Sequence, residues 1–263
     1  MSDRQPFKPD ALDLALRLRV RAIGRLFLRE GVSFWAVCGY LFMEYVRPQS
    51  AWPVLDVLPF AQIFLVVAGA TAFFDPKARI TFDATHVWMA LFLIVILASS
   101  RFALWPDVSD RNFMAFFGWF VIYFIITTVV RTRARFMLFL GIFLLASFKL
   151  AFHGARVWAL RGFTFASWGL MGPPGPFQNS GELAVQMVIF TAISFQLWLL
   201  VRRGRSGILA RWYSLLPLTG AMTVLGASSR GSQVALGGIV ISRIIVNWRR
   251  VGVLFGAILI SAV

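Results

Sequence analysis

Two short polar segments contain the residues best suited to binding an anion. Residues 172–180 are rich in glycine and proline, and residues 228–232 hold Arg230 among serines and glycine. We expect each segment to open a membrane-spanning helix. The free backbone N–H groups of a helix start, with an arginine in the first turn, favour phosphate and carboxylate groups. The two segments therefore predict an anion site.

The residues next to each helix start support these boundaries. Asn179 can cap a helix, and Glu182 follows it at the spacing of a capping box. Ser229 can cap the second helix, where Gly231 allows a ligand to approach closely. Every helix has an N-terminus, however, and an arginine at a membrane boundary can simply bind lipid headgroups. Both interpretations stay open for each motif alone.

A basic ridge precedes the first segment. Lys149, His153 and Arg156 are spaced to project from one face of a helix. Lys149 and Arg156 can also extend to the membrane surface as ordinary snorkelling side chains. We predict that Arg230, Lys149 and Arg156 converge on one cavity at the start of the helix that follows residue 181.

Composition identifies the elements that must position these residues. Hydrophobic residues make up 59% of the chain, charged residues 14%, and the mean hydropathy is +0.76. A soluble domain has about 25% charged residues. The fold class is therefore all-α, a polytopic bundle of eight or nine transmembrane helices. The expected spans are 31–46, 56–74, 86–100, 112–130, 136–153, 182–201, 212–228, 231–248 and a ninth beginning at 251.

The distribution of lysine and arginine predicts the orientation. Basic residues are concentrated in the tail and in alternate loops, which is typical of cytoplasmic segments. We expect residues 1–30 to be a cytoplasmic tail and residues 31–263 to be a transmembrane domain with an outer loop at 154–180. Residues 10–30 fit either a helix on the inner leaflet or a solvated basic tail. The sequence ends inside a span, so we expect the domain to continue beyond it.

Several other classes of protein and site are disfavoured. The net charge of +15 is spread over many loops, which argues against a nucleic-acid partner. The single cysteine, Cys38, excludes an intrachain disulfide. The acidic residues expected outside lack paired spacing, so we expect no metal and no cofactor. Arg243 can snorkel from its helix, and His86 has the position of a helix-boundary residue.

The same motifs resemble a known family. The run from Lys149 through Gly172-Pro173-Pro174-Gly175 and Asn179, followed by Ser229-Arg230-Gly231, resembles the O-antigen ligase and polymerase superfamily. Residues 44–49, with the sequence EYVRPQ, are similar to the branch of O-glycosylation ligases associated with exosortase systems.

The resemblance implies a GT-C-type glycosyltransferase of the bacterial inner membrane. Such an enzyme moves a glycan from an undecaprenyl-diphosphate carrier to a lipid or protein acceptor on the periplasmic face. Arg230 matches a diphosphate-binding arginine, Asn179 the loop position and Lys149 the basic position before it. The family's acceptor-activating histidine lies in a later loop, and His153 is in the wrong segment to match it. The catalytic residue is therefore not assigned.

Two further functions fit the same sequence. An O-antigen-type polymerase shares every motif above. A non-catalytic transporter or accessory subunit of polysaccharide export also has many helices with charged residues inside. No internal repeat is visible in the sequence, which favours the enzyme over a transporter built from paired halves.

Overall fold

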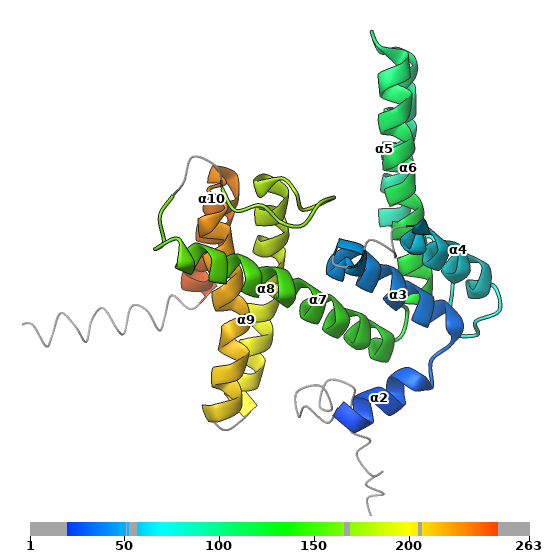
Figure 1. The fold of residues 1–263 in the computed structure, drawn as a ribbon. Helices are drawn as coiled ribbons and strands as arrows, with labels where there is room; N and C mark the ends of the chain where they lie inside the picture. The colour runs from blue at the N-terminus through cyan, green and yellow to red at the C-terminus, as the bar shows by residue number, and fades with distance from the viewer. Residues whose placement is uncertain (1–19, 51, 53–56, 166–168, 205–206, 247–263) are drawn as a thin grey trace, which may run out of the picture. The chain divides into compact units, whose positions relative to one another are not determined.

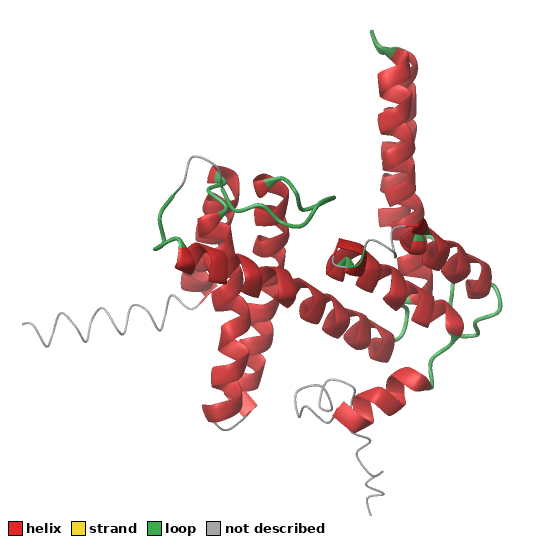
Figure 2. Ribbon diagram, in the orientation of Figure 1, coloured by secondary structure: helices red, strands yellow, loops and turns green. Residues whose placement is uncertain are grey.

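The computed structural model describes residues 20–50, 52, 57–165, 169–204 and 207–246, and every regular element in these ranges is helical (Figures 1 and 2). The chain divides into two compact units, residues 1–143 and 144–263. The elements are α2 (Val20–Leu28), α3 (Val32–Val46), η1 (Pro48–Ser50), α4 (Phe60–Ala72), α5 (Ala84–Arg101), α6 (Pro106–Val129), α7 (Arg133–Leu160), α8 (Ser180–Gly204), α9 (Gly207–Gly226) and α10 (Arg230–Val246). The all-α prediction is confirmed.

Four of the described helices are long and apolar enough to cross a bilayer. They are α5, α6, α7 and residues Ser180–Arg202 of α8, and α4 is a shorter apolar helix. Each of the first eight expected spans coincides with one of α3–α10, because uninterrupted apolar runs of this length form helices in lipid. The protein therefore has the character of a membrane protein. The expected ninth span lies outside the described residues.

The first unit has a core built from α3, α4, α6 and the start of α7. Its buried side chains include Phe34, Val37, Ala68, Val129 and Leu138. Cys38 is buried in the same core as a free thiol. The α3 and α4 helices pack along each other, and both contact α6.

Helix α2 docks onto this core. Ile23, Leu26 and Phe27 pack against it, while Arg25 is exposed. The Trp35 indole N–H donates to the Phe27 carbonyl at 2.9 Å, which fixes the end of α2 against α3. The described part of the expected 10–30 helix thus buries its apolar face against protein. Residues 1–19 lie outside the described ranges.

Helices α5 and α6 pair with each other but leave most of their apolar surface uncovered. Trp88, Ile94 and Val95 are each at least 60% exposed. An apolar exterior on all sides is stable in hydrocarbon and not in water. Asp83 and His86 form a reciprocal capping box at the start of α5, so the expected boundary role of His86 is confirmed.

The second unit packs the end of α7 with α8, α9 and α10. Gly154 of α7 faces Thr223 of α9 so closely that a Cβ at residue 154 would overlap the threonine side chain. The Thr223 hydroxyl donates to the Ala151 carbonyl at 2.8 Å, and Gln186 of α8 donates to Ser147 of α7 at 3.2 Å. Small residues and interhelical hydrogen bonds are typical of helix contacts in membranes.

Helix α7 is longer than expected. Its 28 residues correspond to about 42 Å at about 1.5 Å per residue, against about 30 Å for a hydrocarbon core. Residues 154–160, which the sequence assigned to the start of the outer loop, are helical because Gly154, Ala155 and Trp158 are buried in the bundle. The non-helical connection to α8 therefore begins at Arg161.

Candidate functional site

The start of α8 is capped as expected. The Asn179 side-chain oxygen accepts a hydrogen bond from the Gly181 N–H at 2.8 Å, and the helix begins at Ser180. Glu182 is exposed in the first turn. The position of this helix start, inferred from the Asn179 and Glu182 spacing, is confirmed.

The start of α10 follows a tight turn after α9. Ser228 has φ of 56°, a left-handed conformation that reverses the chain within three residues. The Ser229 hydroxyl donates to the Ser232 hydroxyl at 3.2 Å. Arg230, the first residue of α10, and Gly231 are both exposed. The arginine is therefore in the first turn of its helix, as predicted.

The loop before α8 contacts the end of α9. The Leu170 N–H donates to the Gly226 carbonyl at 3.1 Å. Gly169 lies against the Ala227 carbonyl so closely that a Cβ at residue 169 would overlap it. Segments separated by more than fifty residues in the sequence thus meet directly, and the loop that precedes Asn179 reaches the turn that precedes Arg230.

A cavity of about 340 Å³ adjoins this contact. It is lined by α7 and by the loop: His153, Gly154, Val157, Arg161, Gly169, Leu170, Met171 and Gly172. Its ionisable side chains are those of His153 and Arg161, and the loop contributes the four residues from Gly169 to Gly172. This size falls within the range of pockets that hold small molecules, about 300–1,000 Å³.

The residues of the expected ridge share one exposed face of α7. His153 lines the cavity, but Lys149 and Arg156 do not. Both are exposed, about half a turn away from the buried Ala151 and Trp158. Arg161, which no sequence pattern singled out, also lines the cavity, and Arg230 is not among the lining residues. The convergence of Arg230 with Lys149 and Arg156 stays a prediction.

A second cluster of charged residues lies in the first unit, and no sequence pattern singles it out. The Arg135 side chain is fully buried at the start of α7. Its Nε donates to Glu30 Oε2 at 2.7 Å, its Nη2 to Asp75 Oδ2 at 2.7 Å, and its Nη1 to the Val129 carbonyl at 2.9 Å. One guanidinium therefore joins the starts of α3 and α7 to the ends of α4 and α6.

The carboxylates of this cluster have further partners. Lys77 Nζ lies 2.9 Å from Glu30 Oε1, and the Ser33 hydroxyl donates to Asp75. Burial alone would raise the pKa of Glu30, but hydrogen bonds from Lys77 and Arg135 outweigh it and lower that pKa. Burial also acts to raise the pKa of Asp75. Hydrogen bonds from Ser33, the Lys77 N–H and Arg135 outweigh it, so the pKa of Asp75 is lowered as well. Both groups are therefore charged at neutral pH.

The described residues contain no group of three or more His, Cys, Asp or Glu side chains that could hold a metal ion. The charged side chains at the end of α7 and at the start of α10 are basic instead. Such sites bind anions through charge and backbone N–H groups.

Comparisons with known proteins give one match. No curated protein and no solved structure is similar enough to the chain to match it. A family model described as a family of unknown function, DUF5935, matches residues 12–164. The match takes in α2 to α6 and all of α7, which is more than half of the chain. The chain therefore belongs to the DUF5935 family.

Proposed function

We propose that this protein transfers a glycan from an undecaprenyl-diphosphate carrier to a lipid or protein acceptor, as an O-antigen-ligase-like or O-glycosylation ligase. The reaction takes place at the periplasmic face of the bacterial inner membrane, with the N-terminal tail in the cytoplasm. One observation carries the proposal: the loop before α8 meets the turn before Arg230, next to a cavity with two ionisable side chains.

The chemistry of diphosphate departure fits these residues. Breaking the bond between sugar and phosphate leaves negative charge on the diphosphate, and fixed cations stabilise that charge in the transition state. Arg161 and His153 line the cavity, and Arg230 stands in the first turn of α10. We assign Arg230 and Arg161 to the diphosphate, and Lys149 and Arg156 either to the same diphosphate or to lipid headgroups at the membrane surface.

The backbone supplies further donors. Asn179 caps α8, so the first N–H groups of that helix are oriented by a fixed helix start. Ser229 and Gly231 flank Arg230 and leave the start of α10 open to a ligand. Helix N-termini favour anions by about 0.3–1 kcal/mol each at exposed positions. No described residue is assigned as the base that activates the acceptor.

The test is glycan transfer by single-arginine variants. Arg230→Ala and Arg161→Ala are each expected to lower the transfer rate by about 100-fold, the effect of removing one donor from developing charge. Arg211→Ala removes the same charge from α9, away from the cavity, and serves as the matched control. Transfer is measured with radiolabelled undecaprenyl-diphosphate glycan and purified protein in liposomes.

The products separate the possible functions. A glycan attached to lipid or protein identifies a ligase, and a lengthened carrier-linked glycan identifies a polymerase. Movement of the intact carrier-linked glycan across the bilayer, without transfer, would replace the proposal with transport. A wild-type rate of glycan transfer in Arg230→Ala, in protein that inserts and folds normally, would refute the assignment of Arg230 to the site.

A further inference from the structure

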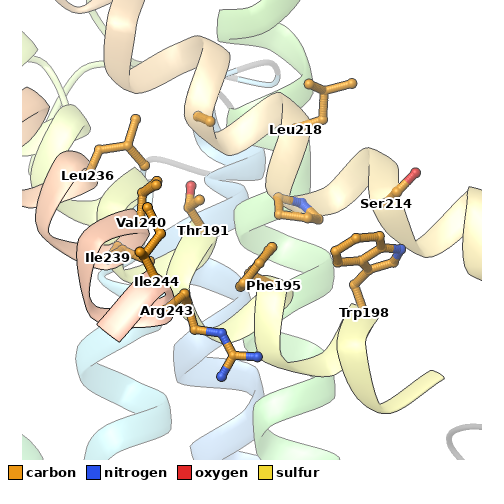
Figure 3. A pocket seen from close by; sticks show the side chains of 12 residues that line it. Thr191, Phe195, Trp198, Ser214, Leu218, Leu236, Ile239, Val240, Arg243 and Ile244 are labelled. Carbon is orange, nitrogen blue, oxygen red and sulfur yellow. The ribbon is translucent and has the colours of Figure 1, made fainter. Parts of the chain in front are cut away.

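A second and larger cavity lies between α8, α9 and α10, away from the proposed transfer site (Figure 3). Its volume is about 660 Å³. The residues that line it are Thr191, Phe195, Trp198, Ser214, Pro217, Leu218, Ala221, Leu236, Ile239, Val240, Arg243 and Ile244.

The wall of this cavity is apolar toward a ligand. The hydroxyls of Thr191 and Ser214 donate to carbonyls of their own helices, Met187 and Arg211, at 2.6 Å each. Leu218 and Val240 are each more than half exposed. Such a surface favours an alkyl chain, since burial of each methylene contributes about 0.8 kcal/mol.

One charged side chain lines the cavity. Arg243 lies in the last turn of α10, and its guanidinium stands 5.8 Å from the centre of the Phe195 ring. Figure 3 shows the guanidinium at one edge of the group, on the side away from Leu218 and Leu236. An apolar chain along the wall would therefore place its polar end at Arg243.

This end of the bundle has no acidic residue of its own. Residues 183–263 contain eight arginines and neither aspartate nor glutamate. Glu182 stands in the first turn of α8, thirteen residues before Phe195, which is about 20 Å along the helix at about 1.5 Å per residue. The net charge of these residues is therefore positive, which favours an anionic ligand.

A second arginine marks the same end. Arg202 of α8 stands 5.4 Å from the centre of the Trp198 ring, and Trp198 lines the cavity. The Trp198 indole N–H donates to the Ala210 carbonyl at 3.0 Å, which holds α8 to α9 there. Tryptophan and arginine together are typical of the headgroup level of a bilayer.

We propose that the cavity between α8, α9 and α10 binds an anionic phospholipid. One acyl chain lies along Leu218, Leu236 and Val240, and the phosphate lies at Arg243 with Arg202 beside it. A negatively charged headgroup is favoured over a zwitterionic one because the surrounding arginines repel an ammonium group. This site does not depend on the proposed glycan transfer.

Lipid binding to the purified full chain in detergent tests the site. Native mass spectrometry compares dioleoyl-phosphatidylglycerol with dioleoyl-phosphatidylcholine, and we expect phosphatidylglycerol to bind more tightly. Arg243→Ala should weaken its binding about tenfold, the effect of one charge-assisted hydrogen bond. Arg211→Ala removes an exposed charge that does not line the cavity and should leave binding unchanged. Equal loss in both variants would overturn the proposal.

Two more measurements address the acyl chain. Ala221→Trp fills the cavity while keeping Arg243, so it should weaken binding of phosphatidylglycerol. A photo-crosslinking benzophenone side chain at position 218 should attach to added phosphatidylglycerol. Attachment to residues 247–263, or to a polyisoprenoid lipid in preference to phosphatidylglycerol, would show a different occupant and refute the site.

Arg243→Lys, which keeps a point charge, should retain part of the affinity.

Discussion

Replacement of Arg135 by alanine tests whether one buried guanidinium holds the first unit together. The side chains of Arg135, Glu30 and Asp75 are 0%, 3% and 5% exposed, so the substitution leaves two buried carboxylates without their shared partner. Loss of one member of a buried ion pair costs about 3–5 kcal/mol. Lys77 still contacts Glu30 and Ser33 still contacts Asp75, so we expect the low end of that range.

Arg131→Ala is the control for this experiment. Arg131 is exposed in the connection just before α7, four residues from Arg135, so its loss changes the local charge by the same amount. Any effect on membrane orientation is therefore matched. Arg135→Lys keeps the charge but cannot reach three acceptors with a fixed planar fork, and its stability should be intermediate.

Unfolding is followed by far-ultraviolet circular dichroism during titration of mixed micelles with dodecyl sulfate. We expect Arg135→Ala to lose about 3 kcal/mol of unfolding free energy and Arg131→Ala to lose less than about 0.5 kcal/mol. Equal loss in the two variants would mean that Arg135 acts only as a loop charge. The network would then make no net contribution to stability.

Three further predictions concern pH and packing. The folded pKa values of Glu30 and Asp75 lie below their ordinary values of 4.5 and 3.8, so their stabilisation is present above about pH 4.5 and is lost as the pH falls through the folded values. The melting temperature of the wild type should therefore fall steeply as the pH is lowered into the acid range. The double variant Glu30→Gln, Asp75→Asn should show a weaker dependence of melting temperature on pH. Gly169→Ala should separate the loop from the Ala227 carbonyl and speed hydrogen exchange at the Leu170 amide, whereas Gly237→Ala, with nothing within 4 Å, should not. Gly154→Ala should cost about 1–3 kcal/mol by overpacking against Thr223, and added Thr223→Ala should restore most of it in the same unfolding assay; no rescue would mean that another contact causes the loss.

The apolar runs of the sequence were enough to locate α3–α10. Helix boundaries followed where a residue has a local role, as Asn179 does at the start of α8. The end of α7 did not follow from the sequence, because the helix continues where Gly154 fits against Thr223, a contact distant in sequence. Tertiary contacts of this kind leave no local pattern.

The candidate site was predictable only in part. The two helix starts were predicted from their capping residues, but the cavity is lined by Arg161, which the sequence analysis did not single out. The helical period places those two side chains together and cannot say which face is buried. Arg135 was hidden for a related reason: it follows Arg131 and Arg133 in a basic run that the expected topology assigns to a cytoplasmic loop.

The order of synthesis gives the Arg135 network a further consequence. Glu30 and Asp75 precede Arg135 by 105 and 60 residues. At about 5–20 residues per second, the ribosome makes Arg135 about 3–12 s after Asp75. During that interval Lys77 and Ser33 are the available partners for the two carboxylates. The first unit therefore cannot complete its packing until the nascent chain has reached α7, and until then the two carboxylates lack their shared guanidinium.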